Sequence, residues 1–246
     1  MSYPVPSGAL HYVPLGDDLT DYGSAGATFS YANGASDDGE PIFATEGTST
    51  LIEGGSERVA SSGAPQILLS NGYTIGFYLR LRETLATLKY VATFRRESGG
   101  SCCTVIVAPR ADGNYGDIAV GMYSTNGINR VRFTVPGMDG LVEDEIYHIV
   151  ILVDPAGTNE LEHVSAYVNG TLMSKAASGN FANNADATIL GSITGSFTMV
   201  GELKHLTVHE YLWSSEEIAA AAAYDGTDAS EVTPQIVVPQ LTIPQL

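Results

Sequence analysis

Hydrophobic and polar residues alternate in short stretches along most of the chain, and Gly, Asn, Asp or Pro separates one stretch from the next. The clearest stretch is residues 74–82. Its apolar positions are Ile75, Phe77, Leu79 and Leu81. A repeat of two residues places these side chains on one face of an extended strand, so the pattern predicts a half-buried β-strand with a polar outer face.

Similar stretches predict strands at residues 89–95, 102–108, 117–123, 129–135, 146–153, 164–168, 171–174 and 200–208. Two of the turns between them contain an Asn-Gly pair, Asn126-Gly127 and Asn169-Gly170. Both central residues of a tight hairpin turn need positive φ, which Asn and Gly tolerate, so each pair predicts a hairpin. Residues 146–153 are a continuous apolar run, which indicates a strand buried on both faces.

One segment, residues 215–224, predicts a helix. Ser214 can cap its N-terminus, and Glu217 completes a capping box. A run of alanines follows, and Asp225-Gly226 provides the exit. Many strands and one short, late helix predict an all-β fold of two packed antiparallel sheets.

Four motifs follow one another in order: Tyr-His-Ile-Val at 147–150, Tyr-Val-Asn-Gly at 167–170, a glycine with alternating hydrophobic residues at 201–208, and Leu-Trp-Ser-Ser-Glu-Glu-Ile at 212–218. Together they resemble the laminin-G-like, concanavalin-A-like jelly-roll family over residues 8–226. The acidic segment 15–23 resembles the opening loop of that family. The resemblance implies a two-sheet jelly-roll sandwich in residues 1–226, followed by a linker and arm in residues 227–246.

The resemblance also implies a calcium site, in which an aspartate of the closing strand acts together with the N-terminal acidic loop. Lys204 and His205 stand at the matching positions. An ammonium group cannot coordinate Ca²⁺ and repels a nearby cation. We therefore expect no metal and no cofactor, and we predict that Lys204 pairs with an acid of residues 17–21.

Other candidate chemistry is weak. The acidic run 143–145 is the nearest approach to the paired carboxylates of a glycoside hydrolase, but consecutive strand residues point to opposite faces and a solvated turn explains the run. Residues 112–117 depart from a calcium-binding EF-hand loop and predict a hairpin loop. His205 and His209 lie roughly 13 Å apart if their segment is a strand, so they cannot share a metal and are expected to be exposed. We expect a protein without enzymatic activity.

Four polar and aromatic residues are candidates for a carbohydrate-binding rim. They are Tyr115, Tyr123, Asn126 and Asn129. Aromatic rings offer an apolar face to a sugar, and amides offer hydrogen bonds. The alternative is that the tyrosines are half-buried packing residues, as in many β-proteins.

Acidic residues outnumber basic ones 28 to 11, which gives a net charge of −17. This charge repels phosphate backbones and anionic lipids, so neither nucleic acid nor a membrane is an expected partner. The N-terminus lacks the pattern of a secretory signal, so we expect synthesis and release in a cytosol, or prior removal of a signal. Cys102 and Cys103 are adjacent, and two reduced thiols are expected over a strained vicinal disulfide.

The last residues repeat Pro-Gln at intervals of five, with apolar residues between. Proline removes a ladder donor, so the segment predicts an extended arm or an edge strand. Its apolar strip predicts a partner-binding surface. The residues of this surface are Pro234, Ile236, Val238, Pro239, Leu241, Ile243, Pro244 and Leu246. The arm either folds back on its own domain or docks on another chain, and we favour docking.

The arm, together with the missing catalytic pair, disulfide framework and signal, favours a non-enzymatic structural protein of a virus particle. The hypothesis is a bacteriophage capsid decoration or surface appendage protein on the virion surface, made in the host cytoplasm. It would bind other virion proteins or copies of itself in a homo-oligomer or symmetric assembly, with a surface glycan as a further candidate partner. The alternative is a secreted or cell-surface, extracellular carbohydrate-binding module.

Overall fold

The computed structural model describes residues 3–55, 57–62, 67–68, 72–83, 85–87, 89–95, 101–109, 116–124, 127–134, 140–154, 156, 164–178, 184–185, 187–191 and 199–226. The strands are β1 Ala9–Val13, β2 Thr28–Ala32, β3 Ser36–Gly39, β4 Ser49–Glu53, β5 Arg58–Ser62, β6 Ile67–Leu68, β7 Tyr73–Leu81, β8 Lys89–Arg95, β9 Ser101–Pro109, β10 Gly116–Ser124, β11 Gly127–Thr134, β12 Ile146–Val153, β13 Val164–Val168, β14 Thr171–Leu172, β15 Ser174–Ser178, β16 Asn184–Ala185, β17 Ala187–Gly191 and β18 Val200–His209. The helix is α2, Ser215–Ala222.

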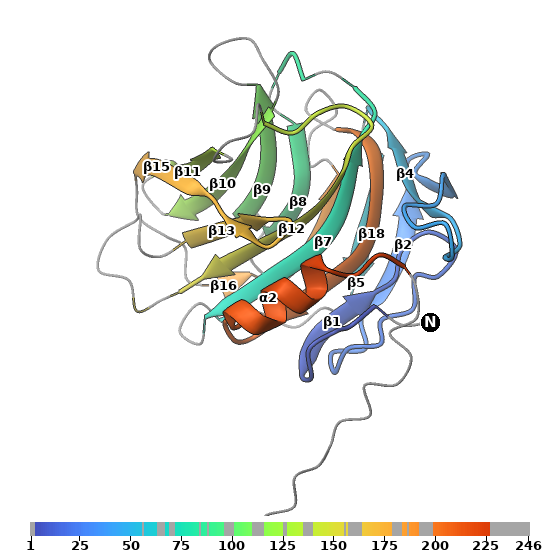
Figure 1. Cartoon of the computed structure of the whole chain (residues 1–246), viewed down its shortest axis with the longest axis horizontal. Helices are drawn as coiled ribbons and strands as arrows, with labels where there is room; N and C mark the ends of the chain where they lie inside the picture. The colour runs from blue at the N-terminus through green and yellow to red at the C-terminus, as the bar shows by residue number, and fades with distance from the viewer. Residues whose placement is uncertain are drawn as a thin grey trace, which may run out of the picture.

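Two curved antiparallel sheets pack face to face (Figure 1). The first sheet has the order β14-β13-β12-β7-β18-β4-β3, and β1 also pairs with β18. The second has the order β15-β11-β10-β9-β8-β17-β5-β2. Neighbours in these orders are often far apart in the sequence, as expected for a jelly-roll sandwich. The predicted fold class is confirmed.

The main hydrophobic core lies between the two sheets. The predicted apolar face of β7 is in this core, and Ile75, Phe77 and Leu79 are completely buried. Side chains of the second sheet, among them Val107 and Phe133, belong to the same cluster. Burial of this apolar surface is the main stabilising term for a sandwich of this size.

A second apolar cluster covers the outer face of the first sheet. Helix α2 lies across this face (Figure 1), and Ile218 and Ala221 are its buried residues. The hydroxyl of Tyr78 in β7 donates a hydrogen bond to the carbonyl of Ala221 at 2.6 Å. The expectation of a half-buried β7 is therefore wrong. The strand is buried on both faces, because α2 and the N-terminal Tyr3 cover the side that the alternation pattern assigns to solvent.

Several local predictions are confirmed. β8 and β12 have the predicted bounds, and β12 is buried on both faces. Asn169 and Gly170 both have positive φ in the turn between β13 and β14. Ser214 accepts a hydrogen bond from Glu217 N–H, and the Glu217 carboxylate accepts one from Ser214 N–H, as in the predicted capping box.

The turn between β10 and β11 differs from the prediction by one residue. Gly127 is the first residue of β11 and pairs with Ser124. It therefore belongs to the strand and not to the turn. Since a hairpin loop is identified by the pairing of its flanking strands, an Asn-Gly pair by itself does not set the register.

The helix α2 has only eight residues, and the described part of the chain contains no helix with the length and hydrophobicity of a membrane span.

Candidate functional site

The candidate site lies where β18 changes its neighbour. Residues 200–203 of β18 pair with β4, and residues 206–209 pair with β1. Between them, the pairing of β18 with β7 is interrupted by a bulge after Lys204, and His205 has a φ of 54°. Left-handed backbone at a residue other than glycine is unfavourable and concentrates at functional sites. The bulge places two consecutive polar side chains, those of Lys204 and His205, in the gap between β1 and β4.

The ammonium group of Lys204 holds the two loops beside this gap together. Its Nζ donates to the carbonyl of Leu15 at 3.1 Å and to the carbonyl of Thr48 at 2.7 Å. The carboxylates of Asp17 and Glu46 lie 3.9 and 4.0 Å away. The predicted pairing of Lys204 with the acidic loop is confirmed for Asp17. Burial lowers the pKa of Lys204, and the nearby carboxylates oppose this shift.

The residues present do not fit the calcium ion that the resemblance implies. Backbone carbonyls and carboxylates are the oxygen donors that Ca²⁺ prefers. Here, however, the Leu15 and Thr48 carbonyls accept hydrogen bonds from Lys204, whose own charge repels a cation. Among the described residues, no group of three or more His, Cys, Asp or Glu side chains is arranged to hold a metal.

We expect chelation of calcium to leave the stability of the protein unchanged. A cation that binds only the folded state raises the midpoint of thermal unfolding, so its removal lowers that midpoint. Since Lys204 supplies the positive charge at this position, thermal unfolding with excess EDTA and with excess Ca²⁺ should give the same Tm. A fall of several degrees on addition of EDTA would contradict the role given to Lys204.

His205 connects the gap to an aromatic cluster. Its Nε2 lies 2.9 and 2.8 Å from the two carboxylate oxygens of Glu46. Because a carboxylate only accepts, Nε2 carries the proton, and Nδ1 accepts from the Tyr12 hydroxyl at 3.2 Å. The ring of Tyr3 stacks on His205 with centroids 4.8 Å apart. The Tyr224 hydroxyl also donates to Glu46.

The protonation states of this pair follow from its surroundings. Burial alone would raise the pKa of Glu46, but the hydrogen bonds from His205 and Tyr224 and the charge of Lys204 hold it below its usual value. Burial lowers the pKa of His205, although Glu46 opposes the shift. At neutral pH the pair is therefore an ionised carboxylate and a neutral imidazole.

A pocket of about 380 Å³ opens at this point, and we call it the histidine pocket. It is lined by Tyr12, Pro14, Asp17, Asp18, Thr45, Glu46, Gly47, Lys204 and His205. Three segments meet around it: β1 with its following loop, the 45–47 loop, and the bulge of β18. The pocket combines aromatic surface with several carboxylates, as in a polar ligand site.

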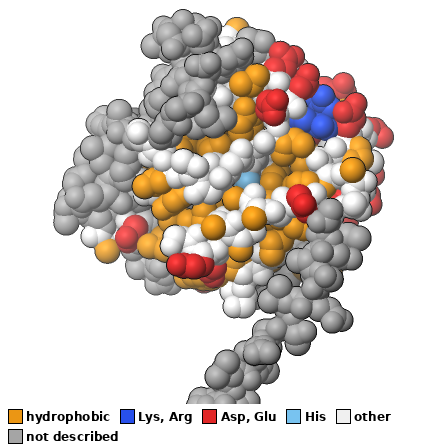
Figure 2. All heavy atoms as spheres, in the orientation of Figure 1, with side chains coloured by type: hydrophobic (Ala, Val, Ile, Leu, Met, Phe, Trp, Pro, Cys, Tyr) orange, Lys and Arg blue, Asp and Glu red, His pale blue; other side chains and the backbone are white. Residues whose placement is uncertain are grey.

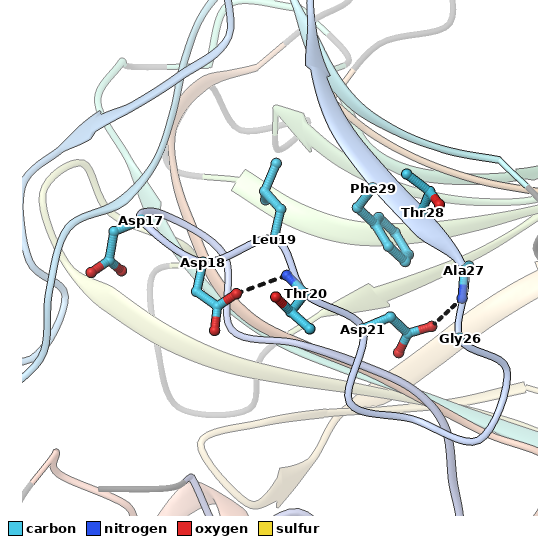
Figure 3. Close-up of a pocket in the computed structure, with 9 residues that line it drawn as sticks. All are labelled: Asp17, Asp18, Leu19, Thr20, Asp21, Gly26, Ala27, Thr28 and Phe29. Carbon is cyan, nitrogen blue, oxygen red and sulfur yellow. Dashed lines mark hydrogen bonds between the residues drawn. The ribbon is translucent and has the colours of Figure 1, made fainter.

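A second, open pocket of about 540 Å³ is lined by residues 17–21 and 26–29, and we call it the loop pocket (Figure 3). Both pockets share Asp17 and Asp18. Asp21 stabilises the folded loop. Its carboxylate accepts hydrogen bonds from His11 and from the N–H groups of Tyr12, Gly23 and Ala27. Asp17 has few such contacts, and its side chain is 63% exposed.

Tyr22 stands beside the histidine pocket and is 62% exposed. Its hydroxyl donates to Asp18 at 2.8 Å, and its ring centroid lies 6.1 Å from that of Tyr12. Burial alone would raise the pKa of Asp18, but the hydrogen bonds from Thr20 and Tyr22 lower it. Tyr22 thus presents an exposed aromatic ring next to an ionised carboxylate.

The sequence-predicted sites lie elsewhere or outside the described residues. Tyr115 and Asn126 are outside them, and Tyr123 and Asn129 are placed in β10 and β11 of the second sheet through their backbones alone. The C-terminal partner surface from Pro234 to Leu246 also lies outside the described residues. The carbohydrate-binding rim and the C-terminal partner surface therefore both remain predictions. The acidic run 143–145 is exposed in a turn, as expected.

The expectation of exposed histidines at 205 and 209 is wrong. His205 is 3% exposed and His209 is completely buried, because Tyr3, Tyr211 and Trp213 pack over the outer face of β18. Sequence reasoning also missed Tyr12, Tyr22 and Glu46. Strand alternation carries no signal for them, since they come from three segments that only the pairing of β1 and β4 with β18 brings together.

Comparison with known proteins agrees with the observed architecture. Residues 53–219, more than half of the chain, match the family model of the concanavalin A-like lectin/glucanases superfamily. No curated protein sequence matches the chain.

Solved structures share the fold at low sequence identity. The receptor-binding domain of botulinum neurotoxin type G is 15% identical, with a TM-score of 0.63 over 88% of this chain and 51% of that one. The ligand-binding domain of botulinum neurotoxin serotype D, solved in complex with N-acetylneuraminic acid, is 9% identical, with a TM-score of 0.66 over 87% of this chain and 50% of that one. The chain thus spans about half the length of these relatives.

Proposed function

Since the chain belongs to the concanavalin A-like lectin/glucanases superfamily, we propose that it binds carbohydrate, without chemical conversion, at the histidine pocket and the adjoining Tyr22. The observation that carries the proposal is the exposed ring of Tyr22, whose hydroxyl donates to Asp18, next to a pocket that Asp17 and Asp18 line. An aromatic face packs against the C–H groups of a sugar ring, and carboxylates accept hydrogen bonds from its hydroxyl groups.

Two further facts support this reading. The site is largely preformed, because Lys204 holds the Leu15 and Thr48 carbonyls and His205 holds Glu46. Preformed sites lose less conformational entropy on binding. In addition, the botulinum neurotoxin serotype D domain was solved with a sugar, N-acetylneuraminic acid, so a protein of this fold is known with a carbohydrate ligand.

The proposal of a virion structural protein has less support. It depends on the arm in residues 227–246, which lies outside the described residues. No feature of the described site points to a virion partner or to a location, so these remain predictions from the sequence.

We expect Tyr22→Ala to weaken carbohydrate binding about tenfold, because it removes the exposed ring without touching the core. The measurement is a glycan array screen of the wild-type chain, followed by isothermal titration calorimetry with the best glycan. Leu172→Ala is the matched control. Leu172 is also an exposed hydrophobic residue, 52% accessible, but it lies in β14 at the opposite edge of the first sheet. Equal affinities for both variants would place the binding site elsewhere.

A further inference from the structure

The charge around the two pockets is strongly one-sided. Asp17, Asp18 and Glu46 line the histidine pocket, and Asp17, Asp18 and Asp21 line the loop pocket. Although burial alone would raise the pKa values of Asp18, Asp21 and Glu46, hydrogen bonds lower them, so all three are ionised at neutral pH. On the face that Figure 2 shows, acidic side chains are also more frequent than basic ones.

The positive charge at the site is not available to a ligand. Among the residues that the structure describes, Lys204 is the one Lys or Arg that lines either pocket, and its side chain is 4% exposed. Its Nζ already donates to Leu15 and Thr48. The carboxylates of Asp17 and Glu46 lie 3.9 and 4.0 Å from the same ammonium group, so its charge is already compensated within the protein, and its burial leaves little access for a ligand carboxylate.

His205 offers no positive charge either. Its Nε2–H is directed at Glu46, and its Nδ1 faces the Tyr12 hydroxyl. Burial lowers its pKa, so the ring is neutral at pH 7. Both polar groups that come from the bulge of β18 are thus bound to groups of the protein, and neither offers an accessible positive charge to a ligand.

We infer that the ligand of this site is an uncharged sugar, and that sugars bearing a carboxylate are rejected. The inference rests on the proposed carbohydrate-binding function and adds the class of ligand. Ionised carboxylates attract hydroxyl groups as donors but repel a second anion. A repulsive element of this kind excludes one class of ligand without weakening the binding of another.

The test compares neutral glycans with their sialylated counterparts, which carry an added sialic acid residue and with it one negative charge; the salt dependence and the charge variants below separate the effect of the charge from that of the added residue. Glycans of both series are screened on an array, and the best neutral glycan and its sialylated derivative are then titrated at 20 mM and 500 mM NaCl. We expect the sialylated derivative to bind at least tenfold more weakly at low salt. The difference in affinity between the neutral and the sialylated glycan should become smaller at high salt, because exposed charges are screened.

Asp17→Asn should also reduce the difference in affinity between the neutral and the sialylated glycan at low salt, since it removes the most exposed carboxylate at the site. Asp38→Asn is the matched control. It makes the same change in net charge at an exposed residue of β3 that lines neither pocket, and it should leave the difference in affinity between the two glycans unchanged.

The outcomes separate the two proposals. If the sialylated derivative binds as well as the neutral glycan, and Tyr22→Ala weakens both, then carbohydrate binding stands and the inference of an uncharged ligand is wrong. If neither series binds at millimolar concentration, or if Tyr22→Ala changes nothing, both are overturned. The inference would also be contradicted if Asp17→Asn and Asp38→Asn changed the difference in affinity between the two glycans equally. The preference for neutral glycans would then come from the net charge of the protein and not from this site.

Discussion

Glu202→Ala should lower the free energy of unfolding by about 3–5 kcal/mol, the largest effect that we expect from a single substitution in this protein. The side chain of Glu202 is 2% exposed and accepts from Nε of Arg80 at 2.8 Å and from Nε of Arg82 at 3.0 Å. Glu202 and Arg80 lie directly opposite each other in β18 and β7. Removal of the carboxylate leaves the guanidinium of Arg80 without its buried counter-charge, and only the exposed carboxylate of Glu40 remains, 3.7 Å away.

Glu40→Ala is the control for this prediction. Glu40 also contacts Arg80 and Arg82, but its side chain is 70% exposed. Ion pairs in contact with water contribute about 0–1 kcal/mol, so Glu40→Ala should have little effect. Urea unfolding of both variants measures the difference. Equal destabilisation would show that the network around Glu202 does not behave as a buried pair.

Acidification should destabilise the protein strongly between about pH 6.5 and pH 4. Burial lowers the pKa of His209 to about 4, although the charge of Glu217 opposes the shift, and it lowers the pKa of His148 to about 3, to which His205 adds. The same groups titrate near 6.5 in the unfolded chain. As the pH falls below 6.5, the unfolded state therefore takes up protons that the folded state does not bind. Stability is present above pH 6.5 and is lost as the pH falls towards the folded values, on the order of 2–3 kcal/mol for each histidine at pH 4.

His209→Phe isolates this effect. Within the described structure, neither ring nitrogen of His209 has a hydrogen-bond partner, and the ring packs edge-on against Tyr211 and Trp213 with centroids 5.1 Å away in each case. Phenylalanine keeps these aromatic contacts and cannot be protonated. The variant should be more stable than the wild-type chain, and the difference should grow from pH 8 to pH 5 in urea unfolding. A difference that stays constant over this range would rule out the titration of His209 as a cause of acid instability.

The elements that depend on local sequence could be predicted closely. Residues 146–153 form β12 as expected, because a run of apolar, partly β-branched residues suits a strand covered on both sides. The Asn169-Gly170 turn and the Ser214–Glu217 capping box are set by residues at most three positions apart. Such features need only the backbone preferences of a few consecutive residues.

The burial of the outer face of the first sheet could not be predicted in this way. The polar and aromatic positions of β7 and β18, among them Tyr78 and His209, follow the alternation of a solvated face. Tyr78 is buried because Tyr3, Phe43 and α2 pack over it, and His209 is buried beneath Tyr211 and Trp213. Alternation reports which residues share a face, but it does not report what covers that face.

The sequence by itself determined strands β7 to β13 and β18, the cap of the helix and the position of a lysine where a calcium ligand would stand, but it gave no prediction of β1 to β6. The tertiary structure alone decided how that lysine is used. Leu15, Asp17, Glu46 and Thr48 reach Lys204 only because β1 and β4 pair with successive parts of β18 and leave a bulge between them. The physical reason is that a buried cation is stable only where several acceptors from distant segments converge, and this convergence is a property of strand pairing rather than of residue order.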